Sequence, residues 1–260
     1  MIKKEAQKFI DSNIFEGMTS ISALIKAIKR GNNGRRIEKI LFDSAKLKSK
    51  RPELSFLKAV SCELSFEIEI CSSDLIDQFS IGNTHGGIIA VCSERTIQNL
   101  SDAVIPSNGV YFMLEGVEDP YNFGNAVRSI YAAGVDGIIV SERNWFGAAG
   151  VVARASAGTS ELIDVYKAST PEDAVAHFKK LGYTVACAGI RDSVDIFETD
   201  LKKPLLLIVG GEKRGISRAV LDMADVVVRI GYGREFNGSL SASATAAVFA
   251  FEILKKNNQL

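Results

Sequence analysis

Three clusters in this chain hold the residues whose types and spacing could do chemistry. The first, Leu114–Arg128 (LEGVEDPYNFGNAVR), runs from a predicted strand through a proline turn into a helix that begins near Asn122. Asn122, Asn125 and Arg128 follow at steps of three residues and so share one helix face. Open α/β sheets bind ligands at the carboxyl ends of their parallel strands. The cluster therefore indicates either a ligand site that contains an arginine or a capped amphipathic helix with a polar outer face.

The second cluster, Leu205–Ser217 (LLLIVGGEKRGIS), joins five apolar residues directly to Gly210 and Gly211. Glycines at such a strand-to-helix turn let the backbone approach a ligand, and the helix start presents free N–H groups. The cluster is not a P-loop, because Ile216 and Ser217 stand where Lys followed by Ser or Thr is required. The dinucleotide pattern G-x-G-x-x-G also fails. An ordinary tight connection accounts for these residues about as well as a ligand loop does.

The third cluster, Ile230–Lys256 (IGYGREFNGSLSASATAAVFAFEILKK), opens as a glycine-rich loop and continues as a helix rich in serine and alanine. Most of this helix is typical of a buried core helix, and only its first turn indicates a site. The chain offers no catalytic triad. Its four cysteines form no C-x-x-C pair, and two histidines are too few for a zinc finger, so we expect no metal.

Alternating elements must position these clusters. After residue 110, short continuous apolar runs alternate with helical patterns, which is typical of a mostly parallel sheet covered on both faces. The expected strands there are 110–114, 137–140, 184–187, 205–209 and 226–230, and the expected helices are 122–133, 171–181, 216–223 and 239–256.

A smaller α/β module is expected before residue 93. Its predicted helices are 20–30, 54–64 and 75–79, and its predicted strands are 37–42, 67–71 and 87–92. The polar stretch that follows contains Pro106 and the turn-forming pair Asn108-Gly109, so it is the expected linker. We therefore divide the chain into a domain at 1–93, a linker at 94–109 and a domain at 110–260.

Composition excludes several classes of protein. The chain has 260 residues, of which 47% are hydrophobic and 24% charged, which rules out a disordered, collagen-like or coiled-coil protein. No apolar run approaches the roughly 18–20 residues of a membrane-spanning helix, and the opening MIKKEAQKF lacks a signal-peptide core. We expect a cytoplasmic protein with free, mostly buried thiols.

The charge of the chain is unevenly distributed. The formal net charge is +0, but residues 1–58 contain 14 Lys or Arg against 6 Asp or Glu, a net of +8. The remaining residues must then carry −8. A basic segment of this kind indicates contact with nucleic acid or a solvated helix face.

Taken in order, the three clusters resemble the SpoU (TrmH-like) RNA 2'-O-ribose methyltransferases of the SPOUT superfamily. The family's D-P-x-N-x-G-x-x-x-R motif is met by Asp119, Pro120, Asn122, Gly124 and Arg128. Its G-x-E-x-x-G motif is met by Gly210 or Gly211, Glu212 and Gly215. Its S-L-N-x-S motif is met by Ser239, Leu240 and Ser243.

The resemblance implies a deep trefoil knot in the C-terminal α/β domain, a small α/β substrate-binding domain before it, and a homodimer. It implies S-adenosyl-L-methionine as the cofactor, held at Gly210, Gly211, Ile230, Gly231, Ser239, Leu240 and Ser241. It marks Asn122, Arg128 and Glu212 as catalytic. A guanidinium group is hard to deprotonate, so Arg128 could act as a base only with the help of a neighbouring phosphate. The alternative, which we favour, is that Arg128 stays charged and stabilises a developing alkoxide. RNA, ribosomal rather than transfer RNA, is the implied partner, with contacts expected at His85, Arg35 and Arg36.

The sequence departs from the family pattern at the predicted cofactor site and at one position of the N-terminal domain. Ser241 stands where the family has Asn, Gly231 and Tyr232 stand where it has Pro and Met, and Gly86 replaces the Gln of a His-Gln-Gly triplet. These departures keep an alternative open, namely an RNA-binding dimer of the same fold with weak or no methyltransferase activity. A metabolic enzyme with a nucleotide cofactor is disfavoured, because its fingerprints are missing.

Overall fold

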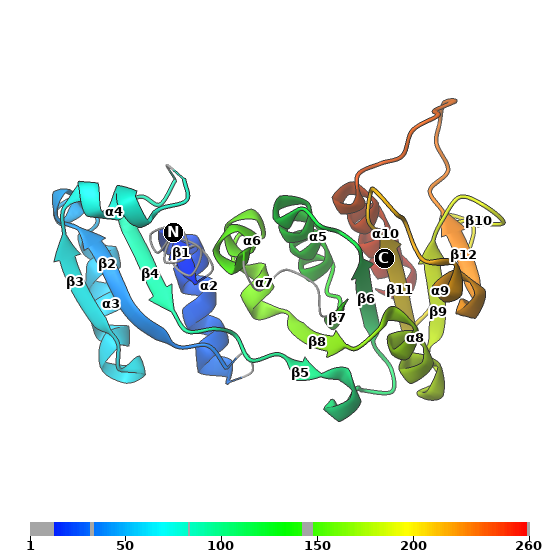
Figure 1. Cartoon of the computed structure of the whole chain (residues 1–260), viewed down its shortest axis with the longest axis horizontal. Helices are drawn as coiled ribbons and strands as arrows, with labels where there is room; N and C mark the ends of the chain where they lie inside the picture. The colour runs from blue at the N-terminus through cyan, green and yellow to red at the C-terminus, as the bar shows by residue number, and fades with distance from the viewer. Residues whose placement is uncertain (1–12, 32–33, 83, 142–147, 259–260) are drawn as a thin grey trace, which may run out of the picture. The chain divides into compact units, whose positions relative to one another are not determined.

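The computed structural model describes residues 13–31, 34–82, 84–141 and 148–258, and the chain forms two compact units (Figure 1). The first unit comprises Met1–Thr96 and Asn144–Leu162, and the second comprises Ile97–Arg143 and Ile163–Leu260. Each unit has its own sheet and its own hydrophobic core.

The first unit is built on a mixed sheet with the strand order β1-β4-β2-β3. Its strands are β1 (Ile14–Glu16), β2 (Ile37–Asp43), β3 (Glu67–Cys71) and β4 (Ile88–Cys92), and its first helices are α2 (Gly17–Arg30), α3 (Arg51–Leu64) and α4 (Ser73–Phe79). The predicted helices and strands of this part are confirmed. Gly31 ends α2 with a left-handed φ of 73°, which a residue without a Cβ adopts at low cost.

Two short helices from much later in the chain belong to this first unit. They are α6 (Ala149–Ala155) and α7 (Thr159–Leu162). A Cβ on Gly150 would lie 2.0 Å from the carbonyl oxygen of Ile14, so α6 packs directly on β1. A buried ion pair of 3.1 Å joins Arg35 to Glu161 of α7. A division made by sequence position alone does not anticipate these long-range contacts.

The second unit is built on a sheet with the order β10-β12-β9-β11-β6-β7-β8-β5. Its strands are β5 (Gln98–Asn99), β6 (Val110–Glu115), β7 (Gly137–Ser141), β8 (Asp164–Ala168), β9 (Thr184–Ala188), β10 (Val194–Asp195), β11 (Leu205–Gly210) and β12 (Val226–Arg229). Each pairing among these described strands is parallel, which confirms the predicted parallel sheet.

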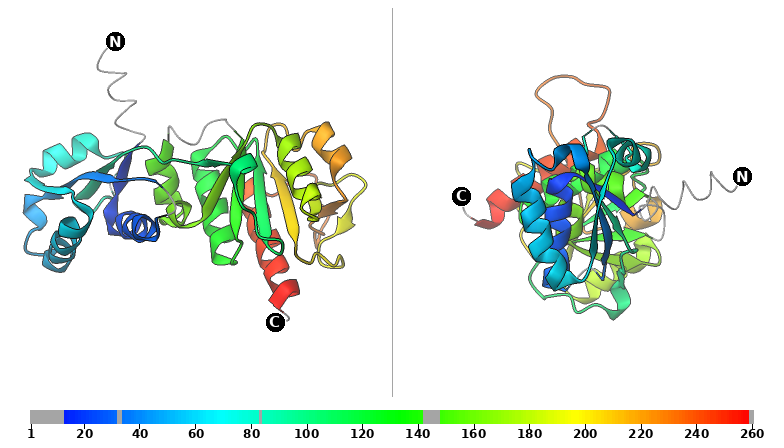
Figure 2. Two further views of the ribbon diagram at one scale, coloured as in Figure 1. Left: turned by 90° about the horizontal axis from the view of Figure 1, so that it is seen from below. Right: turned by 90° about the vertical axis from the view of Figure 1, so that its left-hand side faces the viewer.

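Helices cover both faces of this parallel sheet (Figure 2). The helices are α5 (Pro120–Ala132), α8 (Pro171–Lys180), α9 (Arg218–Met223) and α10 (Ala242–Asn258). Tyr111 and Met113 pack in one buried cluster with α8 and α9. Side chains alternate along a strand, so the equally buried Phe112 points to the opposite face, on the side of the packed pair α5 and α10.

The stretch 94–109, predicted to be a linker, is partly structured. It contains β5 and a short 3₁₀ helix (Leu100–Asp102), and Leu100 and Ile105 are buried in the core of the second unit. These two apolar side chains anchor the otherwise polar segment to that core.

The cysteines are free, and their exposure varies. Cys92 and Cys187 are buried, Cys71 is partly buried, and Cys62 is exposed. Burial raises the pKa of Cys187 to about 12. Among the described residues, no helix combines the length and the apolar character needed to cross a membrane.

Candidate functional site

The loops that follow β9, β11 and β12 surround a cavity of about 500 Å³. The three strands are neighbours and run parallel, so their carboxyl ends meet at one edge of the sheet. Six of the predicted cofactor contacts line this cavity, namely Gly210, Gly211, Ile230, Gly231, Ser239 and Leu240. The seventh, Ser241, is not among its lining residues.

Glycine is required at the start of the loop after β11, which lies beside the start of the loop after β6. The Gly211 N–H donates to the Glu115 carbonyl oxygen at 2.6 Å. A Cβ on Gly211 would lie 2.0 Å from the Gly116 carbonyl oxygen, and a Cβ on Gly210 would lie 2.6 Å from the carbonyl carbon of Gly215. Any side chain at either position would force the backbone apart. Gly211 therefore allows the loop after β11 to lie against the loop after β6, and Gly210 allows the loop after β11 to fold back on its own residue Gly215.

The loop after β12 is shaped by Asp195. A Cβ on Gly231 would lie 2.1 Å from a carboxylate oxygen of Asp195, so this aspartate occupies the space that a proline ring would need. Tyr232, at the position where the family has Met, accepts a hydrogen bond from the Leu240 N–H at 3.3 Å. The departures from the family pattern at these two positions thus have a local packing explanation.

A second cavity, of about 450 Å³, lies between the loop after β6 and the loop after β11. Asn122 and Glu212 line it, and Glu212 also lines the larger cavity. The helix that carries Asn122 begins here because Asp119 caps it, accepting hydrogen bonds from the N–H groups of Tyr121 at 2.7 Å and Asn122 at 2.9 Å. Pro120 occupies the first helical position, where no N–H is needed.

A chain of hydrogen bonds joins the three sequence clusters. The side-chain amide of Asn122 donates to Glu212 Oε1 at 2.9 Å, and its oxygen accepts from Ser243 Oγ at 3.4 Å. Ser243 Oγ lies 3.0 Å from Ser241 Oγ. Ser241 Oγ also accepts from the Ala244 N–H at 3.2 Å, so it caps the start of α10, a role in which Asn and Ser are about equally good.

Arg128 lies apart from this hydrogen-bonded chain. It is exposed on α5, six residues beyond Asn122, and lines neither of the two cavities. Within the part of the chain that the structure describes, its guanidinium has no hydrogen bond or ion pair. The structure therefore brings together two of the three predicted catalytic residues, Asn122 and Glu212, and leaves the third on the surface.

Glu115, the last residue of β6, was not among the site residues predicted from the sequence. Its Oε1 accepts from the Ser217 N–H at 3.3 Å, while its Oε2 is buried with no hydrogen-bond partner among the described residues. Burial raises the pKa of the Glu115 carboxyl above its usual range. The available signal was its position, since a carboxylate directly after a buried strand stands at the ligand-binding edge of the sheet. Among the described residues, no group of three or more His, Cys, Asp or Glu could hold a metal ion.

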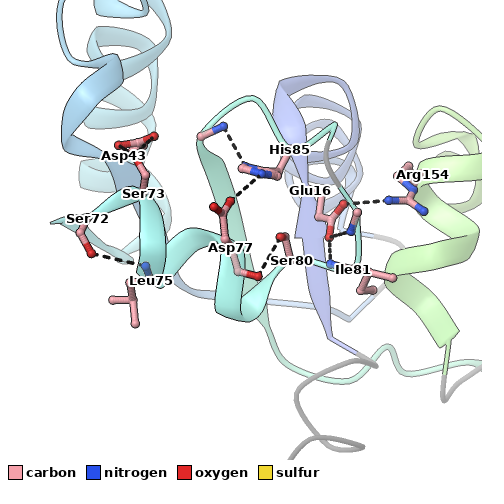
Figure 3. A network of polar contacts seen from close by, with 12 residues as sticks. Glu16, Asp43, Ser72, Ser73, Leu75, Asp77, Ser80, Ile81, His85 and Arg154 are labelled. Atoms are coloured by element: carbon pink, nitrogen blue, oxygen red, sulfur yellow. Dashed lines mark hydrogen bonds and ion pairs between the residues drawn. The ribbon is translucent and has the colours of Figure 1, made fainter.

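In the first unit, His85 orders a tight glycine turn (Figure 3). Its Nδ1 accepts from the Gly87 N–H at 3.0 Å, and its Nε2 lies 3.3 Å from Asp77 Oδ1. Two lysines flank this turn and were not singled out from the sequence. A Cβ on Gly86 would lie 3.2 Å from Lys50 Nζ, and one on Gly87 would lie 2.8 Å from Lys46 Cγ.

The same close-up shows what holds β1 to α6 (Figure 3). Glu16 is buried, and its carboxylate accepts from the backbone N–H groups of Ile81 and Gly82. The other oxygen of this carboxylate pairs with Arg154 at 3.1 Å. Arg154 therefore ties α6 to β1 within the first unit.

Arg35 has a structural position, which corrects its expected role as an RNA contact. Only 4% of the residue is exposed. Its guanidinium donates to Glu161 at 3.1 Å and to the Ser93 carbonyl oxygen at 2.6 Å, and it lies 5.0 Å from the centre of the Phe15 ring. Its neighbour Arg36 is exposed, because successive side chains of an extended segment point to opposite sides.

Fold and site together define an α/β protein with a ligand cavity at the carboxyl edge of a parallel sheet. The family model described as SpoU rRNA Methylase matches residues 109–251, more than half of the chain. The chain belongs to the SpoU rRNA Methylase family, which confirms the resemblance.

Relatives and solved structures agree with this assignment. A putative TrmH family tRNA/rRNA methyltransferase of Staphylococcus haemolyticus is 32% identical over 168 residues, which cover 65% of this chain and 64% of that protein. The 23S rRNA (guanosine-2'-O-)-methyltransferase RlmB of Shewanella oneidensis is 28% identical over 194 residues, 73% of this chain and 78% of that protein. The crystal structure of an AdoMet-bound rRNA methyltransferase from Sinorhizobium meliloti has the same fold, with a TM-score of 0.78 at 22% identity over 97% of this chain and 90% of that one.

Proposed function

We propose that this chain transfers a methyl group from S-adenosyl-L-methionine to a ribose 2'-hydroxyl of RNA, in ribosomal RNA and in the cytoplasm. The observation that carries the proposal is the hydrogen-bonded chain from Glu212 through Asn122 to Ser243. This hydrogen-bonded chain lies beside two cavities that are both lined by Glu212. One cavity can therefore bind the cofactor while the other binds the nucleotide to be modified. The family membership of the chain supports the same activity.

The larger cavity suits the cofactor in size and chemistry. Its volume of about 500 Å³ lies within the usual range of ligand pockets. Aliphatic walls at Ile190, Ile216 and Leu240 match a flat adenine ring, and the glycine backbone of the loop after β11 can approach the ribose closely. When bound, S-adenosyl-L-methionine supplies an electrophilic sulfonium methyl group.

The chain's own residues orient the acceptor ribose and stabilise charge. Glu212 and Ser243 together fix which way the Asn122 amide points, so its polar edge is preorganised beside the smaller cavity. Arg128 stays protonated and stabilises the alkoxide that develops on the 2'-oxygen. Because Arg128 lines neither cavity of its own chain, we assign its action to a homodimer.

Exposed apolar side chains support the proposed homodimer. Helices α5 and α10 pack together and expose the large apolar side chains of Tyr121 and Phe251, which a partner copy would cover. We further propose that the chain around the cofactor cavity forms the deep trefoil knot that the family resemblance implies. Contacts with RNA phosphates are assigned to the first unit, at Arg36 and around the turn of His85.

One observation favours the second candidate function, an RNA-binding dimer with weak or no methyltransferase activity. Ser241 directs its hydroxyl to Ser243 and to the Ala244 N–H and is not a lining residue of the larger cavity. The amide of the family's Asn is therefore not replaced at that cavity, and cofactor affinity would be lower.

Labelled S-adenosyl-L-methionine, incubated with the protein and total RNA, tests the two functions. Methylated riboses mapped in ribosomal RNA support the first function, and RNA binding without label supports the second.

Arg128→Ala should lower the turnover about 10²- to 10³-fold, as the loss of a charge-stabilising group does, while cofactor binding stays unchanged. Arg128→Lys keeps the charge and should retain more activity. Unchanged turnover in Arg128→Ala would overturn the role of this residue.

A further inference from the structure

The loop between β12 and α10 presents two aromatic side chains at the larger cavity. Tyr232 and Phe236 both line that cavity, yet they are 40% and 55% exposed. Figure 1 shows this segment as a long loop that stands out from the sheet. Neither ring is used by the proposed reaction, and half-exposed aromatic rings beside a ligand cavity are candidates for ligand contact.

Both rings are held in place before any ligand arrives. Their centres lie 5.4 Å apart with an angle of 67° between the ring planes, which is an edge-to-face pair. The Tyr232 hydroxyl accepts from the Leu240 N–H at 3.3 Å, so it ties the start of the loop to its end. Phe236 packs on Gly238, where a Cβ would lie 2.6 Å from a ring carbon. Preorganised side chains lose less freedom on binding, so the rings are ready to stack.

The surroundings of the pair favour a flat, neutral ligand group over a phosphate. Arg234 and Glu235 lie in the same loop with opposite charges, and the Asp195 carboxylate fills the space beside Gly231. Ile190, 70% exposed, adds an apolar side chain to the same cavity from the loop after β9. A planar base fits this environment, because stacking on an aromatic ring does not depend on the hydrogen-bonding groups at the edge of the base.

We propose that Tyr232 and Phe236 form a stacking site for a nucleobase. The inference rests on the proposed function, which offers two sources for that base. One is the adenine of the cofactor inside the larger cavity, and the other is a base of the RNA that enters beside it. Stacking on the pair would raise the affinity for the cofactor or for the RNA. It would do so in the loop where Gly231 and Tyr232 depart from the family pattern.

The test uses the full chain and measures two affinities separately. Calorimetry gives the affinity for S-adenosyl-L-methionine without RNA, and fluorescence anisotropy gives the affinity for a short labelled single-stranded RNA of mixed sequence without cofactor. The double variant Tyr232→Leu/Phe236→Leu keeps apolar bulk but removes both ring faces. Loss of stacking should weaken one of the two affinities roughly 5- to 100-fold. Phe56→Leu, at an exposed phenylalanine of α3, is the matched control and should change neither.

Each outcome assigns or rejects the stacking site. A weaker cofactor affinity identifies the base as the adenine, and a weaker RNA affinity identifies it as an RNA base. Tyr232→Phe should keep most of the affinity, since it loses only the hydrogen bond to Leu240. If the double variant binds both ligands as the wild type does, the stacking site is wrong while the proposed function stands. If the wild type binds neither ligand, the proposed function fails and the stacking site with it. Thermal unfolding of each variant confirms that the fold is intact.

Discussion

Glu115 shows how one residue's chemistry follows from its surroundings. One oxygen of its carboxylate is buried without a partner among the described residues, and burial raises the pKa of the group in the folded protein. A carboxyl group whose pKa is raised by folding favours the folded state most when it is protonated. That contribution is fully present below the pKa of the unfolded chain and is lost as the pH rises through the folded-state value.

Replacing Glu115 by Gln should therefore change stability in a pH-dependent way. The amide cannot ionise, so the free energy of unfolding of Glu115→Gln should increase relative to wild type as the pH is raised from acid to neutral. Urea unfolding of both proteins across that range measures the difference. Glu198→Gln, at an exposed glutamate, should show no such trend. A difference that stays constant with pH would contradict the burial argument.

Ser241 carries a structural role that can be separated from cofactor binding. Its hydroxyl caps α10, and replacing a serine cap by alanine typically costs about 1 kcal/mol of stability. Ser241→Ala should lower the free energy of unfolding by about that amount, whereas Ser241→Asn should keep it. Chemical denaturation measures the stability of both variants. Calorimetry with S-adenosyl-L-methionine then tests whether Asn tightens cofactor binding, as the family pattern predicts, and weaker binding would count against that prediction.

At the scale of the elements, the close contact between the loops after β6 and β11 positions the candidate site. Gly211→Ala places a Cβ against the Gly116 carbonyl oxygen, so the backbone must shift. Overpacking of this kind costs roughly 1–3 kcal/mol, and the larger cavity should lose affinity for its ligand. Gly233→Ala is the matched control, because a Cβ there meets nothing within 4 Å, and it should change stability by less than about 0.5 kcal/mol. Equal stabilities for the two variants, measured by thermal unfolding, would refute this explanation.

The elements themselves differ in how visible they are in the sequence. The continuous apolar run of β11 was predicted because the signal lies in neighbouring residues. The helix α5 was predicted too, but with a start near Asn122, whereas the Asp119 cap begins it at Pro120. The strand β8 (DVYKA) was missed, since its side chains are mostly polar or half-buried and give no apolar run. The 3₁₀ helix at Leu100–Asp102 was read as linker because its single buried leucine lies among polar residues.

At the scale of the whole molecule, a zero net charge conceals a basic N-terminal region. In the described part of that region, Lys46 and Lys50 lie against the glycine turn of His85. If this turn contacts RNA phosphates, Lys46→Gln/Lys50→Gln should weaken RNA binding. It should also reduce the slope of log K against log salt by about 1.4, or 0.7 for each lost contact with single-stranded RNA.

The salt series should be run on a matched pair of exposed lysines as well. Lys180→Gln/Lys202→Gln removes the same charge from the second unit and should leave the slope unchanged. An equal reduction of the slope in both double variants would show that the effect is general electrostatics and not a site at the turn of His85.

Local pattern determined most of the longer helices and strands, the parallel sheet and the three site clusters, because hydrophobic periodicity, caps and glycine turns act between near neighbours in the chain. Tertiary structure alone decided which of those residues meet. It placed Ser243 beside Asn122, buried Arg35 against Glu161, and left Arg128 on the surface. These outcomes depend on packing between segments far apart in sequence, and no local pattern encodes which distant segment will lie against a given residue.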